Sequence, residues 1–212
     1  IILAAGNRVQ DRVGANKING ALANRFVHLT LEADVNDWVN WGLSEGNIDP
    51  NVIAFIRYRP ELLFDFNKDS VAWASPRAWE SVSDIIKADT KDMVVNSQDQ
   101  ALIGGTVGEG VAVEFCAFMG MVNTLPDVSE IIKNPETYPI SEDPSVLYAL
   151  TGALSRKADA TNFEAIITYV TREDMNNEFA VITVQDAITT SPKLAKTKAY
   201  VDFMGKYQHI MT

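Results

Sequence analysis

Arg77 is the residue whose position most strongly suggests chemistry. The stretch Ser75-Pro76-Arg77 is typical of a helix start, because serine caps free backbone N–H groups and proline fits the first helical position. Arg77 then falls in the first turn, where the helix dipole is positive and a cation is disfavoured. A guanidinium in this place either stays solvated, pairs with a local carboxylate, or faces an anion from outside the helix.

The elements that must position Arg77 are helices. Trp79, Val82 and Ile86 recur at helical spacing and predict a helix from Ser75 to about Ala88 with one apolar stripe. The same periodicity, with Asp caps and proline boundaries, predicts further helices at residues 34–46, 49–59, 98–122, 128–133, 145–157, 162–172, 176–189 and 194–206.

Two short strands are predicted before residue 33. Ile1–Ala5 is a short apolar run, and Val27–Leu31 alternates apolar and polar residues. Between them, a polar loop at 6–17 leads into a short helix at 18–24. The predicted fold is therefore mainly α, with two strands at the front. Because a buried strand needs neighbours on both edges and nothing upstream supplies them, we expect the chain to be a fragment of a longer protein.

The composition argues against several classes of function. The chain of 212 residues has a formal net charge of −10 and a pI of about 4.6, which disfavours binding to nucleic acid or to an anionic membrane. The longest apolar stretch, 111–122, is too short to span a bilayer. The single cysteine, Cys116, is expected to be a buried thiol in a reducing compartment, which predicts a cytoplasmic protein.

Motifs for other chemistries are absent from the sequence. No phosphate-binding loop of the form GxxxxGK[ST] occurs, and the glycine-rich stretch 104–110 lacks the strand of a dinucleotide site. Its glycines are expected to allow close approach between helices. His28 and His209 stand alone and no cysteines pair, so no metal site is predicted.

Three patterns occur in a fixed order over residues 1–88. A strand ends in Asn7, a short helix ends in Arg25-Phe26 before a strand, and a helix begins at Ser75-Pro76-Arg77. An Asp-capped helical region separates the second pattern from the third. This ordered set resembles the second half of an AAA+ ATPase of the MoxR-like type.

The resemblance implies a role for each of three residues. Asn7 would be sensor 1, which orients the attacking water near the γ-phosphate. Arg25 would be the arginine finger that faces the nucleotide of a neighbouring subunit, with Arg8 and Arg12 in the preceding loop as alternatives. Arg77 would be sensor 2, carried by the helical lid that closes over the nucleotide.

The resemblance also implies a domain organisation and an activity. Residues 1–33 would end the ATPase core, 34–124 would form the helical lid, and 125–212 would be a helical extension without a family role. The intact protein would use ATP and Mg²⁺, assemble as a ring and remodel protein clients as chaperone-like machines do. No nucleic acid and no membrane are expected as partners.

The departures from the family pattern define a second hypothesis. The Walker A and Walker B segments would lie upstream, and they supply the phosphate loop and the metal ligand. The chain as given is therefore expected to hold no cofactor and to hydrolyse no ATP. The alternative is a non-catalytic, all-helical protein-interaction module whose first 30 residues form an arm.

Overall fold

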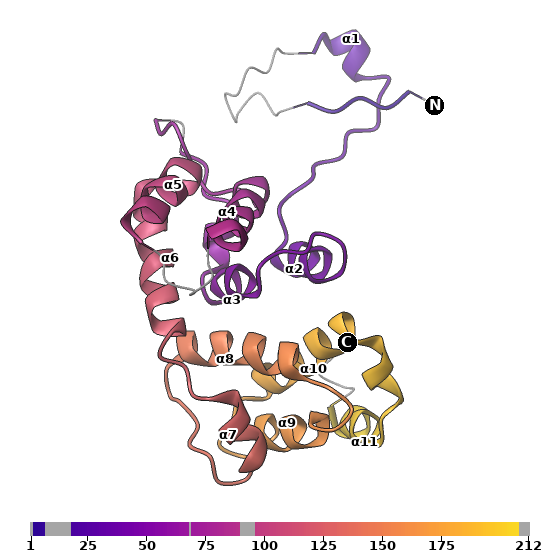
Figure 1. Ribbon diagram of the computed structural model, residues 1–212. Coiled ribbons are helices and arrows are strands. Elements are labelled where there is room, and N and C mark those ends of the chain that lie inside the picture. Colours follow the sequence, from indigo (N-terminus) through magenta and orange to yellow (C-terminus); the bar gives the residue numbers. More distant parts are fainter. Residues whose placement is uncertain (1, 7–17, 68, 90–95, 208–212) are drawn as a thin grey trace. The chain divides into compact units, whose positions relative to one another are not determined.

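The computed structural model describes residues 2–6, 18–67, 69–89 and 96–207 of the chain. The chain divides into two compact units, Ile1–Ala33 and Asp34–Thr212. Figure 1 shows the elements of both units, coloured from indigo at the N-terminus to yellow at the C-terminus.

The first unit contains one short helix, α1 (Gly20–Ala23), in its described residues. The Asn19 side chain caps this helix by accepting a hydrogen bond from the backbone N–H of Ala21 at 2.9 Å. The helix confirms the predicted element at 18–24 in a shorter form.

The two predicted strands do not form in the described part of the first unit. Neither residues 2–6 nor residues 27–31 pair with a neighbouring backbone there, and Leu29 is 84% exposed. A strand is stable only when its N–H and C=O groups have partners on an adjacent strand. The local alternation at Val27–Leu31 therefore predicts a strand that finds no partner strand among the described residues of this unit.

The second unit is built from helices, which confirms the mainly α prediction. Over the whole chain, the described residues contain 11 α-helices and no named strand. After α1 come α2 (Val35–Ser44), α3 (Pro50–Tyr58), η2 (Pro60–Leu63), α4 (Pro76–Asp89), α5 (Ser97–Val107), α6 (Glu109–Val122), α7 (Val128–Lys133), α8 (Pro144–Lys157), α9 (Phe163–Val170), α10 (Asn177–Thr190), η3 (Pro192–Lys196) and α11 (Lys198–Tyr207).

Two of the predicted helices are each broken into two elements. The helix predicted at 98–122 ends at Gly108, whose φ of +97° is a conformation that side-chain-bearing residues rarely adopt, and α6 begins afresh at Glu109. The helix predicted at 194–206 is interrupted at Thr197, where the extended backbone separates η3 from α11. Periodicity alone does not reveal such breaks, because the apolar spacing continues across them.

The glycines that precede Gly108 serve helix packing in part. A Cβ built on Gly104 would lie 3.7 Å from the Cβ of Ala112, so α5 and α6 approach closely at this position. A Cβ on Gly105 would meet open space. The predicted role in close approach is therefore confirmed for Gly104 but not for Gly105.

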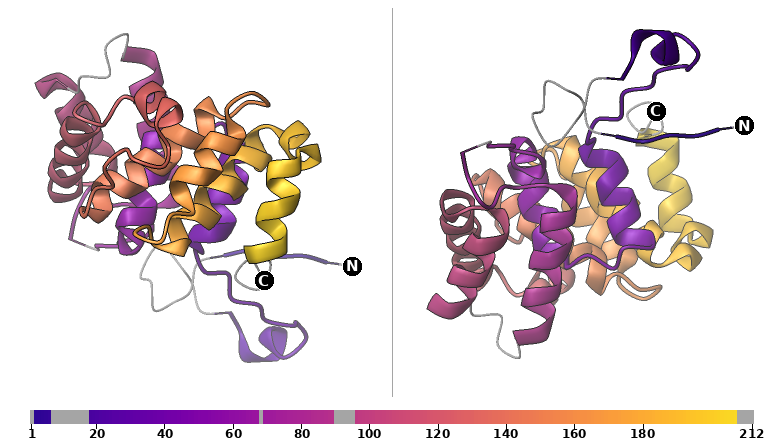
Figure 2. Two further views of the ribbon diagram at one scale, coloured as in Figure 1. Left: turned by 90° about the horizontal axis from the view of Figure 1, so that it is seen from below. Right: turned by 90° about the horizontal axis from the view of Figure 1, so that it is seen from above.

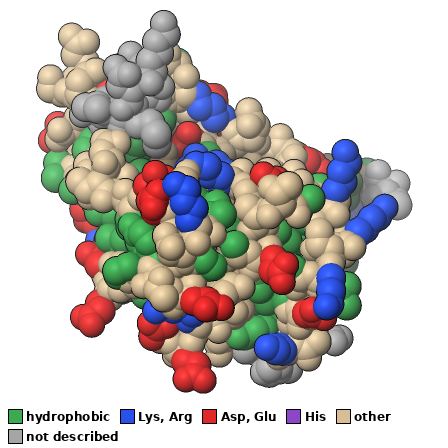
Figure 3. All heavy atoms as spheres, turned by 60° about the horizontal axis from the view of Figure 1, so that its bottom comes forward, with side chains coloured by type: hydrophobic (Ala, Val, Ile, Leu, Met, Phe, Trp, Pro, Cys, Tyr) green, Lys and Arg blue, Asp and Glu red, His purple; other side chains and the backbone are tan. Residues whose placement is uncertain are grey.

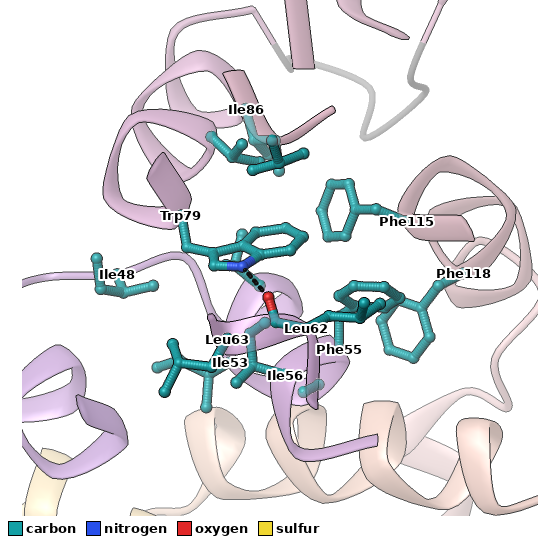
Figure 4. Packing of buried hydrophobic residues seen from close by; sticks show 14 of the residues in the cluster. Ile48, Ile53, Phe55, Ile56, Leu62, Leu63, Trp79, Ile86, Phe115 and Phe118 are labelled. Carbon is teal, nitrogen blue, oxygen red and sulfur yellow. Dashed lines mark hydrogen bonds between the residues drawn. The ribbon is translucent and has the colours of Figure 1, made fainter. Parts of the chain in front are cut away.

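The first of two hydrophobic clusters lies among α2–α6. Phe55 of α3 contacts the rings of Trp79, Phe115 and Phe118 with centroids 5.2–5.4 Å apart, and Figure 4 shows these side chains converging. The Trp79 indole N–H donates to the backbone carbonyl of Leu62 at 2.7 Å, so its polar atom is satisfied inside the core. Aromatic side chains of α3, α4 and α6 therefore form the centre of this cluster, around Phe55.

The second cluster lies among α7–α11. Its fully buried members include Phe163, Ile166 and Tyr169 of α9 and Val184 of α10. The two clusters meet where α3 and α6 contact α8, and where α2 contacts α10. Figures 1 and 2 show α8 lying beside α3, although about 90 residues separate them in the sequence.

Aspartate caps give part of the helical unit a predictable acid sensitivity. Asp143 caps α8 by accepting from the backbone N–H and the hydroxyl of Ser145 at 2.9 and 2.7 Å. These two hydrogen bonds lower the pKa of Asp143. A carboxyl whose pKa is lowered by folding contributes stability above its unfolded pKa of about 3.9, and that stability is lost as the pH falls through the folded pKa.

We therefore expect Asp143→Ala to cost about 1 kcal/mol of unfolding free energy at pH 7. Asp143→Asn keeps an oxygen acceptor but carries no charge. Because wild-type protein loses stability as Asp143 becomes protonated, the difference in unfolding free energy between wild type and Asp143→Asn should shrink between about pH 4 and pH 2. Urea unfolding of both variants across this range measures the effect. A constant deficit of the Asn variant down to the lowest pH would contradict it.

Candidate functional site

Arg77 lies where the helix-start motif predicts. The Ser75 hydroxyl accepts from the N–H of Ala78 at 3.2 Å, and its carbonyl accepts from the N–H of Trp79 at 2.9 Å. These bonds confirm Ser75 as the cap and Pro76 as the first residue of α4. Arg77 therefore stands in the first turn of an ordered helix.

Packing holds the first turn of α4 in place. Trp79, Val82 and Ile86 are 0%, 0% and 4% exposed, which confirms the predicted apolar stripe. Trp79 is fixed further by its hydrogen bond to Leu62. Because Trp79 follows Arg77 by only two residues, the backbone that carries the guanidinium is anchored to the core.

The Arg77 side chain itself points away from this core. Arg77 is exposed, and it has no ion-pair partner among the described residues. The local salt bridge that the sequence left open as an explanation is therefore not formed within the described part of the chain. Within the described residues, no ion pair therefore offsets the cost of a cation at the positive end of the helix dipole.

Arg25 lies in the turn that follows α1. Its backbone N–H donates to the carbonyl of Leu22 at 3.0 Å, and its side chain is exposed. The neighbouring Phe26 is half-buried. About 33 residues bury too little apolar surface to make a core of their own.

Of the predicted site residues, only Arg25 and Arg77 fall within the described part of the chain. Asn7, Arg8 and Arg12 lie outside the described residues. Arg25 and Arg77 belong to different units, each of which defines the surroundings of its own arginine. The three candidate residues are therefore not assembled into one site by the structure.

An ion pair that the sequence did not predict links the two hydrophobic clusters. Arg57 of α3 donates to both carboxylate oxygens of Asp186 of α10, at 2.5 and 2.7 Å. The two side chains are only 14% and 4% exposed. This is a bidentate pair largely removed from water, in which each charge depends on the other.

A sequence signal for this pair existed in hindsight. Asp186 is the one acid of α10 beyond its first turn, and Arg57 follows a run of apolar residues in α3. Charged residues that fall on buried helical faces are paired in most proteins. The partners are 129 residues apart, so spacing could not connect them.

A cavity of about 360 Å³ lies between the two clusters. Arg57, Asp186 and Tyr148 of α8 lie in its wall, with Lys87 of α4. Burial and a hydrogen bond to Glu178 raise the pKa of Tyr148 to about 12, so its hydroxyl stays protonated. Lys87 follows Arg77 by ten residues, or about 15 Å of helix, so the cavity opens far from the Arg77 side chain.

Other chemistries find little support in the described residues. No group of three His, Cys, Asp or Glu there could hold a metal ion. Cys116 is half-buried, and burial together with the nearby Asp99 raises the pKa of its thiol, which disfavours the nucleophilic thiolate. None of the helices in the described ranges combines the length and apolarity needed to cross a bilayer.

The chain matches no protein-family model, no curated protein and no solved structure. Its function is therefore inferred from its own residues and their surroundings. Among the three residues that the family resemblance selects, Arg77 has the most completely defined environment: a capped helix start, a buried anchor and a side chain without an ion-pair partner in the described part of the chain.

Proposed function

We propose that this chain is the carboxyl-terminal part of an AAA+ ATPase of the MoxR-like type, which couples ATP binding and hydrolysis to the remodelling of protein partners. Residues 1–33 would end the ATPase core, and 34–124 would form the lid. Residues 125–212 would extend the lid as a second helical cluster. In the intact protein these parts would work within a ring of identical subunits in the cytoplasm.

The observation that carries this proposal is the state of Arg77. An exposed guanidinium is held on an anchored helix start, at the end of the dipole that attracts anions, without an ion-pair partner among the described residues. A phosphate group fits this arrangement, because guanidinium donors match phosphate oxygens in geometry and charge. Arg77 would bind the phosphates of ATP when the lid closes.

The remaining roles follow from the resemblance. Asn7 would orient the attacking water, and Arg25 would reach the nucleotide of the neighbouring subunit. ATP and Mg²⁺ would be held mainly by a phosphate loop and an acidic strand that precede residue 1. Arg77 and Arg25 contribute positive charge, so the residues of this chain suit the phosphate end of the nucleotide.

Arg77→Ala in the intact ATPase tests the proposal. We expect ATP binding or turnover to weaken about 10- to 100-fold, since a charge-assisted contact to phosphate is lost. The melting temperature should stay unchanged or rise slightly, because a cation leaves the positive end of α4. Isothermal titration, a turnover assay and thermal unfolding measure the three quantities.

Arg156→Ala is the matched control, because Arg156 of α8 is also exposed and has no ion-pair partner among the described residues. It should leave ATP binding and turnover unchanged. If both variants weaken turnover equally, or if Arg77→Ala mainly lowers the melting temperature, Arg77 is structural and the sensor role is wrong.

A non-catalytic helical interaction module is the second candidate. It is favoured by the finding that residues 2–6 and 27–31, which should belong to an ATPase sheet, pair with no strand in the described part of the chain. The two candidates differ in the intact protein: an ATPase hydrolyses ATP with Mg²⁺ and a module does not.

A further inference from the structure

Four lysines near the end of the helical unit form a group of unpaired cations, which we term the lysine surface: Lys193 and Lys196 of η3, and Lys198 and Lys206 of α11. All four are exposed, and none has an ion-pair partner among the described residues. The rest of the unit behaves differently. In the described part of residues 34–190, five of eight Lys and Arg side chains form salt bridges: Arg57, Arg59, Lys87, Lys133 and Arg172.

The helices place these lysines on two stripes, one on η3 and one on α11. Lys193 and Lys196 are three residues apart in a 3-10 helix, which has three residues per turn, so they project from the same side. Lys198 and Lys206 lie on one stripe of α11 with Asp202 between them. Asp202 forms no salt bridge with either lysine, although it lies four residues before Lys206, which is the more favourable order, and four residues after Lys198, which is the weaker one.

Buried side chains of η3 and α11 anchor the backbone that carries the lysine surface. Leu194 and Phe203 are each 2% exposed, and the ring of Phe203 stacks on that of Tyr207 with centroids 4.6 Å apart. Val201 lies one turn after Lys198 and is 61% exposed, so an apolar side chain sits beside the cations. Figure 3 shows Lys and Arg side chains along the right-hand edge of the molecule, the side on which η3 and α11 lie in Figure 1.

The charge of this region is opposite to that of the remaining chain. Residues 191–212 hold four lysines and one aspartate, whereas residues 1–190 hold 14 basic and 27 acidic side chains, a formal charge of −13. The net negative charge of the remaining chain disfavours, through charge repulsion, the binding of a long polyanion that extends beyond the lysines. A short acidic segment avoids that repulsion, because charges more than about 8 Å apart are largely screened at physiological salt.

We propose that the lysine surface docks a short acidic segment of a partner protein. The lysines would meet the carboxylates of that segment, and Val201 would contact an apolar side chain between them. Protein segments of mixed acidic and apolar character fit this pairing, since electrostatic complementarity steers the encounter and apolar contact adds to the affinity. The interaction needs no nucleotide, so the binding test is independent of whether the intact protein is an ATPase.

The test is fluorescence anisotropy with a fluorescein-labelled octaglutamate peptide and the chain as given, at about 25 mM salt. We expect wild-type protein to bind the peptide and to lose it as salt is raised. Lys196→Glu/Lys198→Glu should weaken binding about ten-fold or more, because like charges then oppose each other. Lys196→Gln/Lys198→Gln, which only neutralises the two charges, should give an intermediate loss.

Arg156→Glu/Lys157→Glu is the matched control, since it changes the net charge equally at two exposed cations of α8 that also lack an ion-pair partner among the described residues. It should weaken binding less than about three-fold. Equal weakening by both charge reversals would overturn the proposal, as would absence of binding at about 1 mM peptide. Tighter binding of an octathymidylate than of the peptide would assign the surface to nucleic acid and also overturn it.

Discussion

Replacing Arg25 by alanine is expected to lower ATP turnover by the intact ATPase about 10³-fold or more, while ATP binding stays nearly normal. A guanidinium directed at a neighbour's γ-phosphate stabilises charge that develops in the transition state, and it contributes little to ground-state binding. Arg25 is exposed in the turn after α1, so its loss removes no buried contact. Steady-state turnover and equilibrium nucleotide binding measure the two effects separately.

Mixing two variants distinguishes an Arg25 that acts on the neighbouring subunit's nucleotide from an Arg25 whose loss disrupts its own subunit. Arg25→Ala protein should regain partial turnover when mixed with a second variant that keeps Arg25 but cannot hydrolyse its own nucleotide. Asn24→Ala, in the same turn and also exposed, is the control and should retain turnover. If Arg25→Ala leaves turnover unchanged, or if mixed rings form without recovery, the finger lies elsewhere, and Arg8 and Arg12 are the next residues to replace.

Replacing Asp186 by alanine is expected to lower the free energy of unfolding by about 3–5 kcal/mol. The guanidinium of Arg57 would remain between the two hydrophobic clusters, 14% exposed and without its bidentate partner. An uncompensated buried charge costs far more than the net stabilisation that the intact pair provides. Urea unfolding followed by circular dichroism measures the loss.

Two further variants test whether the loss of stability comes from leaving the Arg57 charge buried without a partner. Asp174→Ala breaks the ion pair between Asp174 and Arg172, in which the Asp174 side chain is 56% exposed. It should lower the free energy of unfolding by less than about 1 kcal/mol. Arg57→Met/Asp186→Leu removes both charges and should recover most of the loss, because apolar side chains can replace a buried pair. If Asp186→Ala costs no more than Asp174→Ala, the Arg57 pair is effectively solvated and does not join the clusters energetically.

The sequence by itself determined the local features of this protein. Helix starts could be predicted because capping depends on residues within one turn of each other. The starts found in this way are marked by Ser75 with Pro76, by Asp34 and by Asp49. The apolar stripe of α4 likewise follows from spacing alone. For the candidate site, this locality sufficed to place Arg77 on the first turn of a helix, but not to say what its side chain meets.

Tertiary structure decided every feature that depends on distant partners. Val27–Leu31 has strand periodicity but pairs with no strand in the described residues, and Gly108 breaks a continuous helical pattern by adopting a positive φ. The pairing of Arg57 with Asp186 depends on α3 and α10 meeting across 129 residues of sequence. The lysine surface became distinctive only when the structure paired five of the eight described cations of residues 34–190 and left these four lysines without an ion pair in the described part of the chain. Local rules set by backbone geometry act within a turn, whereas burial and ion pairing are set by which elements pack together.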